Sequence, residues 1–177
     1  MDNLYIPLYY YLSAMLNQIR FSKICILFML SMYMTLVVLN NVTDYGSNFL
    51  FVSNILSMSD VFSESAPSWR ALHSETLHHI FYVMIIFMEL SIAVLLAIGG
   101  LRLWRFRNAS AGEFASAKKY GIYGLLLGLA LWFTAFVTVA GEWFLMWQSV
   151  DWNGNPTAFR NSIVFLLVTI HVTNTND

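Results

Sequence analysis

One acidic residue stands in the middle of a long apolar run. The run extends from residue 77 to residue 101, with Glu89 at its centre. A carboxyl group is costly inside a bilayer and usually faces protein or water rather than lipid. Glu89 therefore indicates a proton or cation site in which burial favours the neutral acid. The alternative is structural: the acid hydrogen-bonds Thr134, Thr138 or a backbone carbonyl and holds helices together.

A second acid, Glu142, precedes Arg160 in the chain, and we expect both near the same membrane interface. An ion pair between them would fasten the last two apolar segments across a short loop. Arg70, just before the run that contains Glu89, is a competing partner for the same carboxylate. We expect a structural tie here rather than a reactive site.

Histidines gather close to an acid at one end of the same run. His73, His78 and His79 flank Glu75, and such groups can bind zinc or copper. The spacing is poor, however, because His78 and His79 point about 100° apart on a helix. Haem would need two imidazoles at matching depth, and His171 is expected on the opposite side of the membrane. We expect hydrogen-bonding interfacial histidines, with no metal and no cofactor.

The elements that carry these residues must be adapted to lipid. The chain has 177 residues, of which 58% are hydrophobic and 11% charged, with a mean hydropathy of +0.62. Soluble domains carry about 25% charged residues. The net charge of −1 argues against a nucleic-acid partner, and the single Cys25 cannot form an internal disulfide. Length and composition together predict one membrane domain over residues 1–177.

Four apolar segments predict an all-α membrane protein, a bundle of four transmembrane helices. Apolar stretches of about 20 residues span a bilayer, and the predicted spans are residues 21–39, 77–101, 120–146 and 158–172. The last is short for a full crossing. Residues 1–20 lack the basic start of a signal peptide and are expected to form an interfacial lead-in helix.

The distribution of charge predicts the orientation. Most lysine and arginine residues precede the first span or lie between the second and third, at residues 102–119. The positive-inside rule then places both termini and that loop in the cytoplasm, and the loops 40–76 and 147–157 outside. The lipid bilayer is the expected surrounding partner.

The long 40–76 loop is too apolar to be a free linker and is expected to cap the bundle outside the membrane. Phe51, Ile55, Leu56 and Met58 have the spacing of an amphipathic helix, and residues 63–68 have the composition of a turn. Tryptophans gather at the outer end of the third span, as in an aromatic belt: Trp143, Trp147 and Trp152.

Small residues recur at helical spacing in the third span. Gly124 and Gly128 form a GxxxG pattern, and Gly121 extends it. Such stripes let helix backbones approach closely. The contact could lie within the bundle or between copies of the chain.

Several segments together resemble a family of predicted small integral membrane proteins of bacteria, grouped as a domain of unknown function. The similarity covers roughly residues 20–170 and is most specific at 141–149; it also includes segments 41–48, 69–71, 77–79, 152–154 and 158–160, and Glu89. The resemblance implies a four-helix protein of the inner membrane of a bacterium and supplies no activity. It also marks an outer polar cluster: Asn41, Asp44, Asn48, Trp69, Arg70, His78, His79, Glu142, Trp143, Gln148, Trp152, Asn153 and Arg160.

This outer polar cluster has two interpretations. Buried polar groups need partners, so its members could satisfy one another and lock the outer end. They could instead line a pocket for a small ligand or lipid headgroup, with Glu89 as its floor.

No nucleophile and base, phosphate-binding glycine loop or dense metal motif is present in the sequence. We therefore expect a non-enzymatic accessory protein that associates with another membrane protein or with itself. The alternatives are a small transporter, channel or ligand-binding protein that uses Glu89, and a haem-carrying redox subunit.

Overall fold

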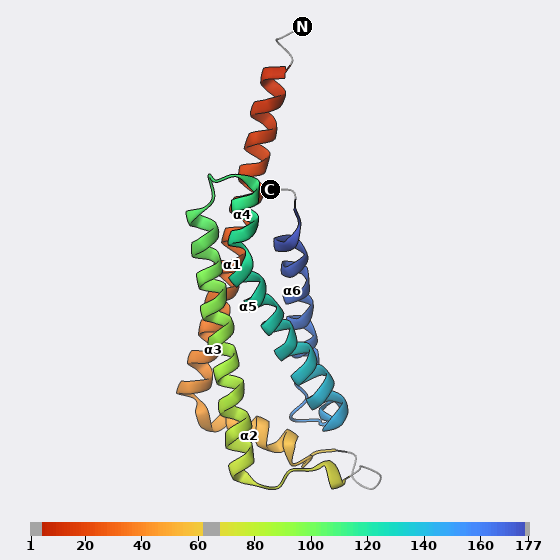
Figure 1. Cartoon of the computed structure of the whole chain (residues 1–177). Helices are drawn as coiled ribbons and strands as arrows, with labels where there is room; N and C mark the ends of the chain where they lie inside the picture. Colours follow the sequence, from red (N-terminus) through yellow and green to blue (C-terminus); the bar gives the residue numbers. More distant parts are fainter. Residues whose placement is uncertain (1–4, 62–67, 176–177) are drawn as a thin grey trace.

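Long helices that run side by side make up the chain (Figure 1). The structure is a computed structural model that describes residues 5–61 and 68–175, and those residues contain no strand. The helices are α1 (Tyr5–Thr43), α2 (Tyr45–Leu56), α3 (Glu75–Arg105), α4 (Ala111–Ala117), α5 (Lys119–Leu129), η2 (Ala130–Trp143) and α6 (Asn155–Thr173), with short 3₁₀ turns η1 (Ser68–Arg70) and η3 (Met146–Gln148).

Three helical segments of the described chain are long and apolar enough to cross a membrane. They are Ala14–Thr43, Glu75–Arg105 and Ala111–Trp143, and they contain the first two predicted spans and residues 120–143 of the third. Helix α6 covers the fourth predicted span, whose crossing stays a prediction. Helix α1 begins at Tyr5, so residues 5–20 of the predicted lead-in continue directly into the first span as one helix.

Local sequence fixes where the central helices begin. The Ser74 hydroxyl accepts the backbone N–H of Leu77 at the start of α3, where Glu75 also suits the positive end of the helix dipole. Ser110 and Glu113 form a reciprocal capping box at the start of α4. The first cap begins α3, and the second lies within the connection that reverses the chain between α3 and α5.

One end of the bundle holds most of the basic residues, and we call it the basic end: Arg20, Lys23, Arg102, Arg105, Arg107, Lys118 and Lys119. Here the Arg20 guanidinium donates to the backbone oxygens of Arg107 (2.9 Å) and Ala109 (2.8 Å). Lys23 and Lys118 both donate to the backbone oxygen of Asn174. These bonds tie α1 to the turn after α3 and to the end of α6.

Glycines bring α3 and α5 together near the basic end. A Cβ added at Gly99 would lie 2.5 Å from the Cα of Gly121, and one at Gly124 would lie 3.1 Å from Leu96. Gly128, one turn further, faces the ring of the fully buried Phe165 on α6. Because Gly121 also faces Leu27 of α1, the predicted glycine stripe packs within the chain, against three of its own helices.

Beyond Gly128 the helix widens. Residues Ala130–Trp143 form a π-helix, in which bonds run to the fifth residue back. The Phe144 N–H bonds the Val139 oxygen (3.1 Å), and the Thr138 hydroxyl bonds the Phe133 oxygen (3.0 Å). The sequence predicts one span over residues 120–146, and its regular apolar pattern gives no sign of this change.

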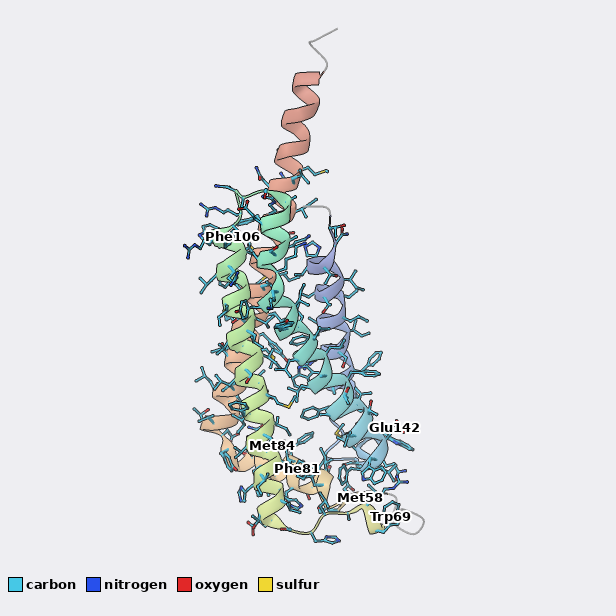
Figure 2. All side chains as sticks on the ribbon, viewed as in Figure 1. Met58, Trp69, Phe81, Met84, Phe106 and Glu142 are labelled. Carbon is cyan, nitrogen blue, oxygen red and sulfur yellow. The ribbon has the colours of Figure 1, made fainter. Side chains whose placement is uncertain are left out.

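Helices α3 and η2 diverge away from the basic end, and α2 lies between them at the far end (Figure 1). We call this region the α2 end; Figure 2 places Met58 and Trp69 there, opposite Phe106. Helix α2 buries Val52, Ile55 and Leu56. The predicted amphipathic helix thus exists within the 40–76 loop, whose role as an extracytoplasmic cap stays a prediction. Residues 63–67 of the predicted turn lie outside the described residues.

Candidate functional site

Glu89 is bound by an asparagine from another helix. Its side chain is 2% exposed, and its Oε2 accepts the Nδ2–H of Asn41 at 2.6 Å. Tyr82 lies two turns before Glu89 on the same face of α3, and its hydroxyl donates to the backbone oxygen of Asn41 at 2.9 Å. The end of α1 is therefore attached to the middle of α3 through buried polar groups.

The residues predicted as partners of Glu89 lie elsewhere. Thr134 and Thr138 are exposed on η2, and the Thr138 hydroxyl is used by the backbone of its own helix. The π-helical geometry of η2 changes which of its residues face the other helices, and both threonines lie on its exposed face. The partner is Asn41, which the sequence placed in the outer cluster rather than beside Glu89.

A cavity of about 700 Å³ opens beside Glu89. It is bounded by α1, α2, α3, η2 and the start of α6, and its lining residues are Tyr33, Leu36, Val37, Asn40, Asn41, Asn48, Phe51, Val52, Tyr82, Ile85, Glu89, Trp132, Phe136, Asn153, Gly154 and Thr157. Its floor is buried, at Tyr82, Glu89 and Trp132. Its mouth is formed by exposed residues of α1 and α6, among them Leu36 and Thr157.

Two buried side-chain nitrogens, one on a residue that lines this cavity and one on a residue hydrogen-bonded to a lining residue, have no partner among the described residues. Nε1 of Trp132 is one, on a side chain 8% exposed that lines the cavity. The other is Nδ2 of Asn161, whose Oδ1 accepts the hydroxyl of the cavity residue Tyr33 at 3.2 Å. Buried donors without partners are uncommon, so the cavity offers unused hydrogen-bonding capacity.

A second cavity, about 260 Å³, lies between α2, α3 and η2 and is almost wholly apolar. Phe81, Met84, Met88 and Val139 are among its lining residues, and Figure 2 shows Phe81 and Met84 on α3 toward the α2 end. Four residues line both cavities: Phe51, Val52, Ile85 and Phe136. They form the wall between a polar and an apolar chamber.

The histidines join α2 to the start of α3. His78 is buried, with Nε2 at 2.8 Å from the Leu72 oxygen and Nδ1 at 2.8 Å from the Ser53 hydroxyl. His79 stacks on Phe49, with ring centroids 3.9 Å apart. In the part of the chain that the structure describes, no three His, Cys, Asp or Glu side chains are grouped so as to hold a metal ion.

Arg70 packs among tryptophans. Its guanidinium lies 4.8 Å from the ring of Trp143 and 5.5 Å from that of Trp69, and these two rings meet edge to face. Glu142 is exposed at the edge of the bundle (Figure 2). Across residues 5–61 and 68–175 it forms no ion pair with Arg160 or Arg70. The predicted tie is wrong, because both Glu142 and Arg160 point to the surroundings.

The outer polar cluster therefore divides instead of converging. Asn41, Asn48 and Asn153 line the polar cavity, and Trp152 packs edge to face against Phe51 in its wall. His78 and His79 bind α2, and Trp69, Arg70 and Trp143 form the stacked group. Of the remaining members, Asp44 and Gln148 form hydrogen bonds through their backbone. Glu142 and Arg160 are exposed.

Asp60 is a residue whose role the sequence does not reveal. Its carboxylate accepts the hydroxyl of Ser149 (2.6 Å) and the N–H groups of Val150 (2.9 Å) and Asp151 (3.1 Å). These bonds, that from Ser149 first, lower the pKa of Asp60 below its ordinary value of 3.8. They fasten the segment after α2 to the loop before α6.

The sequence also gives no sign that Trp132 and Tyr33 line the cavity, because aromatic residues in apolar runs are usually interpreted as facing lipid.

Comparison with known proteins identifies the kind of protein but not its ligand. Curated proteins and solved structures gave no match. Residues 19–175 match a family described as predicted small integral membrane proteins, DUF2165. This confirms the resemblance seen in the sequence and accounts for the helices long and apolar enough to cross a bilayer. The chain therefore belongs to the DUF2165 family of small integral membrane proteins.

Proposed function

We propose that this membrane protein binds a small ligand, without catalysis, in the polar cavity beside Glu89. The observation that carries the proposal is a cavity lined both by the buried carboxyl group of Glu89 and by Trp132, whose Nε1–H has no partner among the described residues. Ligand sites are concave, mainly apolar, and contain a few convergent polar groups. This cavity has all three properties.

The polar floor is held in place before any ligand arrives. Asn41 orients Glu89 through the 2.6 Å bond, and Tyr82 orients Asn41. Fixed polar groups reduce the cost of ordering a site when the ligand binds.

The accessory role that the sequence favours is less well supported. One argument for it is the glycine stripe, and Gly121, Gly124 and Gly128 pack against α1, α3 and α6 of the same chain. A ligand-binding protein explains the cavity, whereas an accessory protein has no need of it.

The proposal places the protein in the inner membrane of a bacterium, with α6 as a fourth crossing helix and both termini in the cytoplasm. The basic end would then face the cytoplasm, in agreement with the positive-inside rule. The mouth of the cavity would open in the outer half of the bilayer.

The test is native mass spectrometry of the full chain extracted gently from its own membrane. A Thr157→Trp variant fills the mouth from an exposed position on α6. Leu167→Trp is the matched control, because Leu167 is 59% exposed on the same helix and does not line the cavity.

We expect a bound small molecule in the wild type and in Leu167→Trp and its loss from Thr157→Trp. Equal retention by all three proteins would contradict the proposal, as would a wild-type protein that retains nothing. A large complex with other proteins and an empty cavity would favour the accessory role.

A further inference from the structure

We propose that the ligand is an amphiphilic amine: an ammonium group and a neighbouring oxygen bind inside the cavity while an apolar chain extends into the bilayer. This inference rests on the proposed function and names the chemical class of its ligand. It follows from the charge, the walls and the mouth of the cavity.

The charge of the cavity selects a cation. Glu89 is the one carboxyl group among its described lining residues, and no Lys, Arg or His is among them. A buried charge needs a partner of opposite sign. An anionic head would meet the acid and no base, whereas an ammonium group would pair with the Glu89 carboxylate.

The walls suit an ammonium group. Aromatic side chains make up much of the cavity lining, namely Tyr33, Phe51, Tyr82, Trp132 and Phe136. Cations are attracted to the faces of such rings, most strongly where water is excluded. The amide groups of Asn40, Asn48 and Asn153 at the other side supply further polar contacts.

Trp132 adds a requirement for an acceptor. Trp132 lines the cavity, and its buried Nε1–H has no partner among the described residues. An ammonium group cannot accept this hydrogen, because it only donates. A hydroxyl or ether oxygen close to the nitrogen of the ligand would satisfy it.

The mouth is half apolar and half polar, which suits an amphiphile. On α1, Tyr33 and Leu36 are exposed and lie nearer the middle of the bundle than the exposed Asn40. An amphiphile could enter sideways from the bilayer, with its chain along Leu36 and its head beneath Asn40. A water-soluble amine would leave the Leu36 surface to lipid.

The experiment is calorimetric titration of the full chain in nanodiscs of neutral phosphatidylcholine, corrected with empty nanodiscs. The probes are dodecylamine, N-dodecylethanolamine, dodecanol, dodecanoate and butylamine. We expect dodecylamine to bind at least about tenfold more tightly than the alcohol, the acid or the short amine. N-dodecylethanolamine, which adds the oxygen, should bind more tightly than dodecylamine.

Variants assign each preference to a side chain. Glu89→Gln keeps an acceptor for Asn41 and should abolish the preference for amine over alcohol, while Glu142→Gln, the exposed control acid, should leave it unchanged. Trp132→Phe should abolish the advantage of N-dodecylethanolamine over dodecylamine. Circular dichroism of each variant checks that the helices remain folded.

Binding of dodecanol as tight as that of dodecylamine, or a preference that survives in Glu89→Gln, would overturn the amine assignment. Tight binding of butylamine would overturn the amphiphile assignment. Either result, if binding is still blocked by Thr157→Trp, leaves the proposed function standing. If Thr157→Trp blocks the binding of none of the probes, the cavity takes no ligand of this kind and the amine proposal fails.

Discussion

The basic end and the α2 end of this bundle solve the packing of helices in different ways. Near the basic end, α3 and α5 meet through Gly99 and Gly121, and an added Cβ would collide with backbone. At the α2 end, η2 is a π-helix, α2 lies between the separated helices, and two cavities flank it. At the basic end glycines let the helices pack closely, whereas at the α2 end large side chains surround two cavities.

This difference shows how a short chain can make room for a site. Interhelical contact at glycines brings backbones together through dispersion and gives a rigid anchor. The anchor lets the same helices diverge beyond it without coming apart. At the open end, polar bonds such as the one between Asn41 on α1 and Glu89 on α3 hold together two of the helices that border the polar cavity.

The largest effect should come from closing the space at the anchor. Gly99→Ala places a Cβ 2.5 Å from the Gly121 backbone, and backbone cannot move aside as a side chain can. We expect a loss of about 3 kcal/mol in unfolding free energy, measured by unfolding in detergent. Gly112→Ala is the control, because nothing lies within 4 Å of its Cβ. Equal behaviour of the two variants would remove the distinction between the ends.

A smaller effect is expected at the open end from Asn41→Ala. The substitution leaves the buried Glu89 without its donor and should cost about 2 kcal/mol. The same unfolding measurement applies. Asn48→Ala also lines the cavity, but the Asn48 amide donates to the Asp44 backbone one turn away, so it should change stability by less than about 0.5 kcal/mol. A similar cost for both would show that the Asn41–Glu89 bond contributes little.

Next comes the stacked group at the surface of the α2 end. Arg70→Ala removes a guanidinium 4.8 Å from the Trp143 ring and should cost about 0.5–1 kcal/mol. Arg160→Ala serves as its comparison, since Arg160 is exposed and forms no ion pair in the described parts of the chain. A greater loss from Arg160→Ala would reverse our interpretation of the two arginines.

The smallest effect should be the pH dependence from Asp60. Because its pKa is lower in the folded protein than its ordinary 3.8, the ionised carboxylate stabilises the fold above that pH. The stabilisation is lost as the pH falls through the folded value. The melting temperature of the wild type should exceed that of Asp60→Asn near neutral pH. The difference should shrink below pH 3.8; a constant difference would exclude ionisation as the cause.

The sequence predicts the helical membrane fold well, because length, apolar composition and charge placement are properties of each segment alone. It also identifies Glu89, Asn41, Asn48 and Asn153, which the structure gathers at one cavity. It does not pair Glu89 with Asn41, because that contact depends on how far α1 extends before α2 begins.

The errors have a common origin at the open end. Thr134 and Thr138 were expected to face Glu89, yet the π-helical turn presents Trp132 and Phe136 to the cavity instead. Glu142 and Arg160 have opposite charges and were expected at the same depth in the membrane, but both are exposed. Side-chain direction depends on helix type and on packing between distant segments, neither of which a linear pattern contains.

The two cavities are separated by the side chains of four residues that line both of them. Phe51, Val52, Ile85 and Phe136 each face a chamber on both sides. Trimming one of these side chains would merge the chambers, and enlarging one would narrow either, while the helices stay where they are. Exchange of these four apolar residues for larger or smaller ones would therefore change the size and shape of both cavities while the charged and polar residues stay the same.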